Sequence, residues 1–325
     1  MNRTKLWVLA CLIVLSMLIA PIAPIAPIAV AQETNLRAAV FVPPNTTVGE
    51  FFARFVAELN KQGKGLIQMT LVGPDAVPPF EQPNALRTGV IDMAAVPPAY
   101  YTSVMPESDA QTLSQQGISQ QRASGAWAAI NKLTNQKVNA WYLATYGTGL
   151  PFHIYTTKPV TNADFKNFKL RTAPNYTTFF QSLGANVVNT APGEVQTALE
   201  RGVVDGYGWP IIGIFDMGWA AVTKYRVDPG FYNVVVNILV NLNRWQSLRE
   251  DQRAFLNRMS EWAEQENTKW VNEKTGAEVK RQADAGIKVL DFGPEFKKRA
   301  HDVYWAELTK RAPEAIGTLR PLLEK

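Results

Sequence analysis

Residues 194–205 read EVQTALERGVVD, and residues 81–92 read EQPNALRTGVID. Glu, Ala, Leu, Gly, Val and Asp occupy the same places in both stretches without a gap. Each stretch has the pattern of a short helix, a glycine that ends the helix (Gly89 or Gly202) and a strand. Two copies of one helix–strand unit predict two lobes of related α/β design.

A second similarity lies upstream of both copies. Leu-Arg followed by Pro-Asn occurs within residues 36–45 and again within residues 170–175. In both segments a strand is expected to enter a loop, where Asn45 or Asn175 is placed to N-cap a helix. The alternative is a chance similarity between two ordinary strand–loop–helix units, which is harder to maintain for two similarities in the same order.

The remaining pattern is that of an α/β chain with parallel, helix-connected strands in each lobe. These strands are expected at residues 36–42, 66–72, 91–96, 169–172, 185–188 and 203–207, with a last strand at 286–290 and a terminal helix at 295–312. Two long extended runs, residues 141–155 and 230–242, are expected to pass between the lobes and to act as hinges.

A long helix is expected after the second extended run. Ser247 and Glu250 form a candidate capping box at its start. Apolar residues at helical spacing, from Phe255 to Trp270, carry the pattern on to about residue 285.

The first 31 residues have the three parts of a secretory signal peptide. Arg3 and Lys5 form a positive start, and an apolar run covers residues 6–20. Ala29 and Ala31 are small residues at the positions that signal peptidase reads, so cleavage is expected near Ala31. The mature chain is therefore expected to work outside the cytoplasm.

Two alternatives to cleavage near Ala31 stay open. One is a retained membrane anchor, although the apolar run is short for a bilayer span of about 20 residues and prolines interrupt its extension. The other is lipoprotein processing at Cys11, which would leave the rest of the apolar run on the mature protein. Cys11 is the only cysteine, so the cleaved chain would hold no disulfide, cysteine nucleophile or zinc–thiolate site.

The charge of the chain argues against a nucleic-acid partner. The formal net charge of +5 falls to about +3 when Arg3 and Lys5 leave with the signal peptide. This excess is small, and lysine and arginine are scattered without an aromatic–basic stripe.

The mature chain carries few signs of catalytic chemistry. Its histidines are His153, in an extended run with apolar neighbours, and His301, in a charged helical segment; a structural and a solvated role are expected for them. No nucleophile elbow, phosphate loop or metal-ligand spacing occurs. Asp92 and Asp205, paired by the repeat, are expected to bond locally. No enzymatic activity, cofactor or metal site is predicted.

Several segments stand in the order and spacing of a known family. They are DFKNFKLR at residues 164–171, LGA at 183–185, EVQTALERGVVDG at 194–206, the earlier ALRTGVID at 85–92 and the segment at 243–248 before the long helix. Together they make the chain resemble the solute-binding subunit of TRAP transporters, the DctP-type family. The resemblance covers nearly the whole mature chain.

The resemblance implies a fold and a division into lobes. The fold would be α/β, a two-lobed periplasmic binding protein of the Venus-flytrap kind, with hinge strands and a long helix that spans both lobes. Lobe I would comprise residues 32–150 and about 236–275, and lobe II would comprise about 151–235 and 276–325.

The resemblance also implies which residue holds the ligand. In the family, the arginine of the Lys-Leu-Arg motif anchors the substrate carboxylate, and here that residue is Arg171. Guanidinium is planar and always charged, so it can bind a carboxylate through two parallel hydrogen bonds. The end of a strand, where Arg171 is expected, is also where open α/β sheets bind ligands.

This chain departs from the sialic-acid branch of the family. That branch has an asparagine at the place of Trp209, a second arginine near Pro151 or Phe152 and an aromatic residue near Pro192. A hydroxyl-rich sugar acid is therefore not expected, because polar partners are missing. Trp209, Phe152 and Tyr207 predict an apolar or aromatic wall instead, and a monocarboxylate ligand with an apolar or aromatic body.

Other loops that follow strands complete the expected site. Asn175 in lobe II, with Asn45 and Tyr100 in lobe I, are the candidates, although Tyr100 fits an ordinary half-buried aromatic equally well.

The sequence thus predicts a monomeric periplasmic protein that captures a small organic carboxylate and delivers it to TRAP membrane permease subunits. A sensory protein that presents its ligand to a receptor shares every feature above. An exported hydrolase or lyase that uses Asp92, Asp205 or His153 is a further rival, and a structural envelope protein is hard to reconcile with Arg171.

Overall fold

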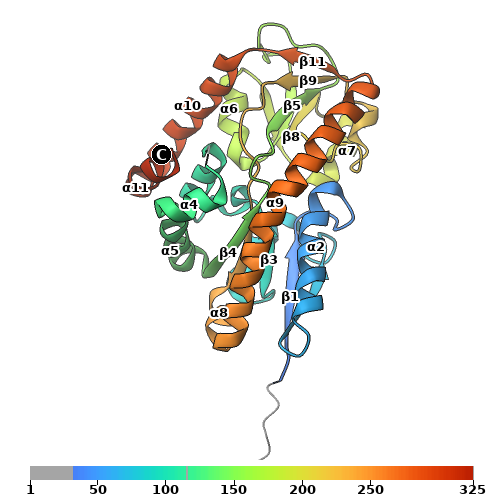
Figure 1. Ribbon diagram of the computed structural model, residues 1–325. Coiled ribbons are helices and arrows are strands. Elements are labelled where there is room, and N and C mark those ends of the chain that lie inside the picture. The colour runs from blue at the N-terminus through green and yellow to red at the C-terminus, as the bar shows by residue number, and fades with distance from the viewer. Residues whose placement is uncertain (1–31, 115, 325) are drawn as a thin grey trace, which may run out of the picture. The chain divides into compact units, whose positions relative to one another are not determined.

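The computed structural model describes residues 32–114 and 116–324, and the chain from Glu33 onward forms one compact unit. This unit contains two β-sheets with helices packed against both (Figure 1). We call the five-stranded sheet and its helices lobe I, and the six-stranded sheet and its helices lobe II. The predicted two-lobed α/β fold is confirmed, whereas the predicted signal peptide, residues 1–31, lies outside the described residues.

Both sheets are mixed. The order in lobe I is β2 (Ile67–Val72), β1 (Thr34–Val40), β3 (Met93–Val96), β10 (Val236–Asn241) and β4 (Ala140–Tyr146). The order in lobe II is β11 (Lys288–Asp291), β9 (Tyr225–Asp228), β5 (Phe152–Thr156), β8 (Gly206–Pro210), β6 (Lys169–Thr172) and β7 (Asn186–Asn189). Strand β1 is parallel to β2 and β3, and β6 is parallel to β7 and β8, as predicted. The extended runs supply the antiparallel strands β4, β5 and β10.

The helices lie mainly between strands and at the end of the chain. They are α2 (Thr47–Gln62), α3 (Gln82–Thr88), α4 (Ile118–Ser124), α5 (Ala126–Val138), α6 (Thr177–Ser182), α7 (Val195–Glu200), α8 (Leu242–Ser247), α9 (Glu250–Asp284), α10 (Pro294–Arg311) and α11 (Pro313–Leu323). Short 3-10 helices include η2 (Pro98–Tyr101), η3 (Pro106–Leu113) and η4 (Pro174–Tyr176).

The repeated segments adopt the same local structure in the two lobes. In lobe I, the Asp92 carboxylate accepts a hydrogen bond from the Arg37 amide at 2.8 Å, and the Asp92 amide donates to the Arg37 carbonyl. In lobe II, Asp205 makes the same pair of bonds with Lys169, at 2.9 and 2.7 Å. The two aspartates directly precede β3 and β8 and fasten the starts of these strands to β1 and β6, which confirms the local role expected for them.

These bonds correct the second sequence similarity. Arg37 is equivalent to Lys169, so the residue of lobe I at the place of Arg171 is Ala39, two positions further along β1. The Leu-Arg pairs of the two lobes are thus out of register by two residues. The arginine side chain at this place belongs to lobe II alone.

Three predicted helix caps are wrong. Thr46, not Asn45, caps α2, because its hydroxyl accepts from the Gly49 amide at 3.2 Å. Asn175 lies inside η4 and caps no helix through its side chain. At α9, the Gln252 side chain accepts from the Arg249 amide at 3.1 Å, whereas Ser247 is the last residue of α8.

The two predicted crossings connect the sheets. The chain passes from β4 in lobe I to β5 in lobe II, and it returns from β9 to β10. Asn267 of α9 holds the first crossing, because its side chain accepts from the Gly147 amide at 2.7 Å and donates to the Thr148 carbonyl at 3.1 Å. Gly147 has a φ of 88° and faces Val234 of the second crossing.

Helix α9 spans both lobes, as predicted (Figure 1). Its 35 residues correspond to a length of about 50 Å. Near the middle, the Trp270 indole N–H donates to Glu50 of α2 in lobe I at 2.9 Å. Near its end, the Gln282 side chain donates to the Ile211 carbonyl and accepts from Arg226 in lobe II. One continuous helix thus ties the two lobes together.

The core lies on both faces of the sheets. Successive residues of a strand point to opposite faces, and in β1 Ala38 and Val40 join one buried cluster while Ala39 joins the other. Each cluster contains residues of both lobes.

The last helix departs from the expected boundaries of the lobes. Residues 276–325 are expected in lobe II, whereas α11 packs against α4 and α5 beside the sheet of lobe I. Pro313 begins this helix, Ala312 separates it from α10, and its apolar residues Ile316, Leu319 and Leu323 are buried.

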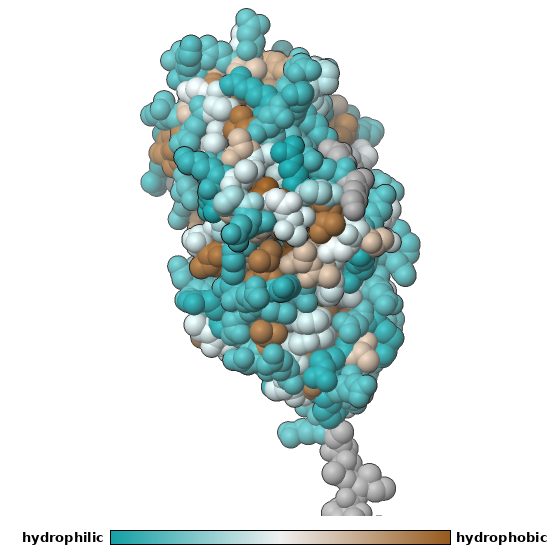
Figure 2. All heavy atoms as spheres, turned by 90° about the vertical axis from the view of Figure 1, so that its left-hand side faces the viewer, coloured by the Kyte–Doolittle hydropathy of each residue, from teal (hydrophilic) through white to brown (hydrophobic). Residues whose placement is uncertain are grey.

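The face shown in Figure 2 is mostly hydrophilic, with hydrophobic side chains gathered across its middle. Among the described residues, no helix is both long and apolar enough to cross a membrane.

We predict that Gly147→Ala destabilises the protein through the first crossing. A Cβ atom there would lie 2.6 Å from Val234 Cγ1, and the positive φ costs a non-glycine residue roughly 1–2 kcal/mol. Gly125→Ala is the matched control, because Gly125 has a φ of 86° but no atom within 4 Å of its Cβ position. Thermal unfolding should show a clearly larger loss for Gly147→Ala, by about 1–3 kcal/mol; equal losses would contradict a tightly packed crossing.

Candidate functional site

A cavity lies where the carboxyl ends of strands from both lobes meet. Phe41 follows β1 and Tyr100 follows β3, while Arg171 and Trp209 lie near the ends of β6 and β8. Ligands of open α/β sheets bind outside these strand ends. The cavity has a volume of about 40 Å³, against roughly 10–15 Å³ needed for one water, so it suits a small molecule.

Arg171 supplies a cation to this cavity, and neutral groups fix its side chain. The residue is 1% exposed. Its Nε and Nη2 atoms donate to the Thr190 carbonyl at 3.1 and 2.8 Å. Its Nη1 atom donates to the Tyr176 hydroxyl at 2.7 Å and to the Gly208 carbonyl at 3.3 Å. A guanidinium has five N–H groups, so at least one is left for a ligand.

Arg171 forms no ion pair with an acidic side chain among residues 32–114 and 116–324. The arginines that do form ion pairs there are other residues. Arg226 shows the contrast. It is also buried, but its guanidinium binds both oxygens of Asp228 at 2.9 and 3.0 Å. A buried charge is costly unless it is paired, so an anion that enters the cavity would compensate the charge of Arg171.

Aromatic rings form the wall around Arg171. The centre of the Trp209 ring lies 5.7 Å from the guanidinium carbon, within cation–π distance. The indole N–H of Trp209 is buried without a hydrogen-bond partner in the described part of the chain. Phe152 lines the cavity beside Tyr176, with 5.6 Å between the ring centres. Two of the three aromatic residues expected in the wall, Trp209 and Phe152, therefore lie at the cavity.

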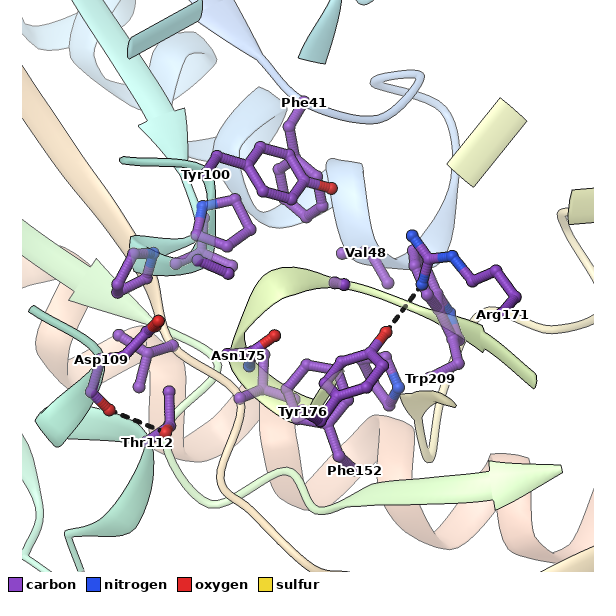
Figure 3. Close-up of a pocket in the computed structure, with 18 residues that line it drawn as sticks. Phe41, Val48, Tyr100, Asp109, Thr112, Phe152, Arg171, Asn175, Tyr176 and Trp209 are labelled. Atoms are coloured by element: carbon purple, nitrogen blue, oxygen red, sulfur yellow. Dashed lines mark hydrogen bonds between the residues drawn. The ribbon is translucent and has the colours of Figure 1, made fainter. Parts of the chain in front are cut away.

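Two polar candidates also line the cavity. Asn175 is 4% exposed, and its side-chain oxygen has no partner among the described residues. Tyr100 enters from lobe I, and its hydroxyl points toward the Arg171 end of the cavity (Figure 3). Burial raises the pKa of Tyr100 well above its usual value, although the charge of Arg171 opposes the rise, so the hydroxyl keeps its proton and can donate.

Two of the candidates lie elsewhere. Tyr207 is on the same face of β8 as Trp209 but two residues further from the strand end, where its hydroxyl bonds to Thr223 at 2.7 Å and its ring stacks on Tyr155. Asn45 is exposed in the loop before α2 and does not line the cavity. The same loop and helix place Phe41 and Val48 there instead.

Asp109 lines the cavity and was missed by the sequence analysis. It lies in η3, a segment without an apolar period, so no pattern in the sequence marked it. It is fully buried, and one carboxylate oxygen accepts from the Tyr304 hydroxyl at 2.7 Å. Burial raises the pKa of Asp109 to about 7, against the lowering effects of the Tyr304 hydrogen bond and the Arg311 charge.

The rival catalytic residues do not meet at the cavity. Asp92 and Asp205 fasten strand starts, and His153 Nδ1 lies 2.9 Å from Asp228 in a buried structural pair. Burial alone would raise the pKa of Asp228, but hydrogen bonds from His153 and Arg226 hold it well below its usual value.

His301, expected on a solvated face, is half-buried with its ring centre 5.9 Å from that of Tyr232. The described residues contain no group of three or more acidic, histidine or cysteine side chains that could hold a metal ion.

Residues 38–311 match the family described as bacterial extracellular solute-binding protein, family 7, also called DctP. The chain belongs to this family. The predicted DctP-type resemblance is thereby confirmed.

Several known proteins resemble the chain over most of its length. The "Monocarboxylate 2-oxoacid-binding periplasmic protein" of Nostoc sp. is 23% identical over 266 residues, which cover 78% of this chain and 72% of that protein. A TRAP periplasmic solute-binding protein from Desulfovibrio salexigens, solved with bound orotic acid, has a TM-score of 0.79, 18% identity and coverage of 89% and 98%. DctP7 of Bordetella pertussis, which binds pyroglutamic acid, has a TM-score of 0.78, 18% identity and coverage of 90% and 100%.

The pKa of Asp109 predicts how the free energy of unfolding depends on pH. Because this pKa is about 7 in the folded protein against an ordinary 3.8, the folded state holds the proton more tightly. The stabilising contribution is complete below about pH 4 and is lost as the pH rises through 7. The shift corresponds to at most roughly 4 kcal/mol.

The wild type should therefore lose stability relative to Asp109→Asn as the pH rises from 4 to 8, as measured by urea unfolding at each pH. Free energies of unfolding that run parallel for the two proteins over this range would show that Asp109 does not titrate there.

Proposed function

We propose that the protein is the periplasmic solute-binding subunit of a TRAP-type transporter and that it binds a small organic carboxylate at Arg171. The observation that carries this proposal is the buried guanidinium, which faces the cavity and has no acidic partner in the described part of the chain. A ligand carboxylate would supply the missing charge. In a closed, water-poor cavity this ion pair is much stronger than in water.

The ligand is a monocarboxylate with an apolar or aromatic body. Phe41, Phe152 and Trp209 give the cavity apolar walls, and hydroxyl-rich ligands would lose hydrogen bonds against them. The relative from Nostoc sp., by its name, binds monocarboxylate 2-oxoacids, which supports the same class. The small volume of the cavity also favours a small acid.

The residues of the cavity take separate roles in this proposal. Arg171 binds the carboxylate, with Trp209 packed on its guanidinium and Phe152 against the body of the ligand. Asn175 offers a hydrogen-bond acceptor, and the Tyr100 hydroxyl offers a donor from lobe I. Tyr207 supports the wall from behind, and Asn45 takes no part.

Delivery depends on opening and closing of the lobes. The crossings at Gly147 and Val234 would act as the hinge, and α9 as the element that keeps the lobes in register. The closed form would present a surface that the membrane permease subunits recognise. The protein would act as a monomer in the periplasm after cleavage near Ala31, and it would release the ligand chemically unchanged.

One contact between the lobes is placed to hold the closed form. Asp216, in the loop after β8 of lobe II, accepts from the backbone amide of Thr47 at the start of α2 in lobe I, at 2.7 Å. A carboxylate at a helix N-terminus also interacts favourably with the helix dipole. Because Asp216 does not line the cavity, it can influence binding only through closure.

Arg171→Ala and Arg171→Lys should both abolish or severely weaken carboxylate binding while the protein stays folded. Lysine keeps the charge but loses the planar fork that holds Thr190 and a carboxylate together. Isothermal titration calorimetry with pyruvate, lactate, 2-oxobutanoate and benzoate, with galactonate and succinate for comparison, measures the effect. Arg201→Ala, which removes an exposed charge of the same lobe, is the control. Unchanged affinity in Arg171→Ala would refute the site, and binding of sugar acids or dicarboxylates alone would refute the ligand class.

Asp216→Ala should weaken ligand binding about 2- to 10-fold. Asp216 does not touch the ligand, and its contact with Thr47 is exposed to solvent, so screening limits its contribution to roughly 0.5–1.5 kcal/mol. Stopped-flow fluorescence should place the change in the rate of ligand release. Asp284→Ala, which removes an exposed carboxylate at the end of α9, should leave release unchanged. An unaltered release rate in Asp216→Ala would exclude this contact as a latch.

A further inference from the structure

Asp109 and Arg171 lie at opposite ends of the cavity, with Asn175 and Tyr176 between them (Figure 3). The two charged side chains come from different lobes, because η3 belongs to lobe I and β6 to lobe II. A ligand held by Arg171 through its carboxylate would therefore direct its other end toward Asp109.

The two oxygens of the Asp109 carboxylate differ in their surroundings. Oδ2 accepts from the Tyr304 hydroxyl, whereas Oδ1 is buried and has no hydrogen-bond partner among the described residues. A buried polar atom without a partner destabilises the folded state. Because Asp109 also lines the cavity, the free Oδ1 is placed to bond to a partner that enters there.

Burial raises the pKa of Asp109, and the groups that face this side chain only partly oppose the rise. Tyr304 and Arg311 come from α10, Tyr101 from η2, and Tyr232 from the crossing before β10. Three of these are tyrosines with pKa values raised by burial, so they stay uncharged. The Arg311 guanidinium donates to the Thr102 carbonyl and forms no hydrogen bond to Asp109 in the described structure.

We infer that Asp109 is a specificity-determining residue, which binds a neutral polar group at the far end of the ligand through Oδ1 and excludes a second carboxylate there. This inference rests on the proposed function, because it assumes that the carboxylate of the ligand binds Arg171. The ligand class it names is a small monocarboxylate with a hydroxyl or carbonyl group remote from its carboxylate.

The chemistry of the two protonation states explains the selection. Neutral Asp109 carries its proton on Oδ1, because Oδ2 is occupied as an acceptor, and Oδ1–H then donates to a ligand carbonyl or hydroxyl. Ionised Asp109 accepts from a ligand hydroxyl instead. A ligand carboxylate at this end would meet a like charge in a poorly solvated cavity, which is strongly unfavourable. Rejection of dicarboxylates should therefore strengthen as the pH rises through about 7, the pKa of Asp109.

The test uses probe acids that differ only at the end remote from one carboxylate. These are butanoate, 4-hydroxybutanoate and succinate, with pentanoate, 5-hydroxypentanoate and glutarate as a longer set. Calorimetric titration of the mature protein at pH 6 and pH 8 should show that the wild type binds the hydroxy acid at least tenfold more tightly than the dicarboxylate, with a wider gap at pH 8. In Asp109→Asn the dicarboxylate should gain at least tenfold at pH 8, and the pH dependence of the gap should disappear.

Glu107→Gln is the matched control. Glu107 lies on the same η3 and is equally buried, with one unpartnered oxygen, but it does not line the cavity. Its substitution should leave the preference between hydroxy acid and dicarboxylate unchanged. An equal shift in Glu107→Gln would assign the effect to the general charge of η3 and overturn the inference.

Tyr304→Phe provides a second line of evidence if Asp109→Asn does not fold. It keeps the carboxyl group but removes the hydrogen bond that lowers the pKa of Asp109, so rejection of the dicarboxylate should begin at a higher pH. A loss of stability without this displacement would show a structural role only. An unchanged preference in Asp109→Asn would overturn the inference and leave the proposed function intact, whereas a wild type that binds none of the acids would overturn both.

Discussion

The buried guanidinium of Arg171 is the interaction on which the rest of the structure depends. Removing such a charge from water costs several kcal/mol, and neutral hydrogen bonds recover only part of this. The Thr190 and Gly208 carbonyls, the Tyr176 hydroxyl and the Trp209 ring hold the cation in one orientation. They leave its charge uncompensated within the described chain, which is the basis for proposing an anionic ligand.

The fold brings the other half of the cavity to this cation. Parallel strands in each lobe direct their carboxyl ends toward one place, and the two crossings between the sheets allow the lobes to meet there. The equivalent position in lobe I is occupied by Ala39, so the two related lobes contribute differently. Lobe II supplies the cation, while lobe I supplies Tyr100, Phe41 and the carboxyl group of Asp109.

Most of the fold could be predicted from the sequence, because the repeat and the strand pattern are local signals. The parallel strands, the two crossings and α9 follow from such signals. The cavity is lined by five of the residues proposed for the site, namely Arg171, Trp209, Phe152, Asn175 and Tyr100. The alternation of side chains along β8 places Tyr207 on the same face as Trp209. It does not show that the cavity ends before Tyr207. Asn45 and Thr46 are both suitable N-cap residues, and the sequence does not show which of the two binds the Gly49 amide. The place of Asp109 at the cavity could not be predicted, because it depends on a contact with the distant helix α10. The place of α11 could not be predicted either, because it depends on packing against α4 and α5, which lie far away in the chain.

A crystal structure of the protein with a ligand retained from its host would test the central claim most directly. The account predicts a small monocarboxylate in the cavity, with its carboxylate oxygens within about 3 Å of the Arg171 guanidinium and its apolar body against Trp209 and Phe152. A ligand whose carboxylate binds elsewhere, or an Arg171 side chain paired with a protein carboxylate in the complex, would contradict it.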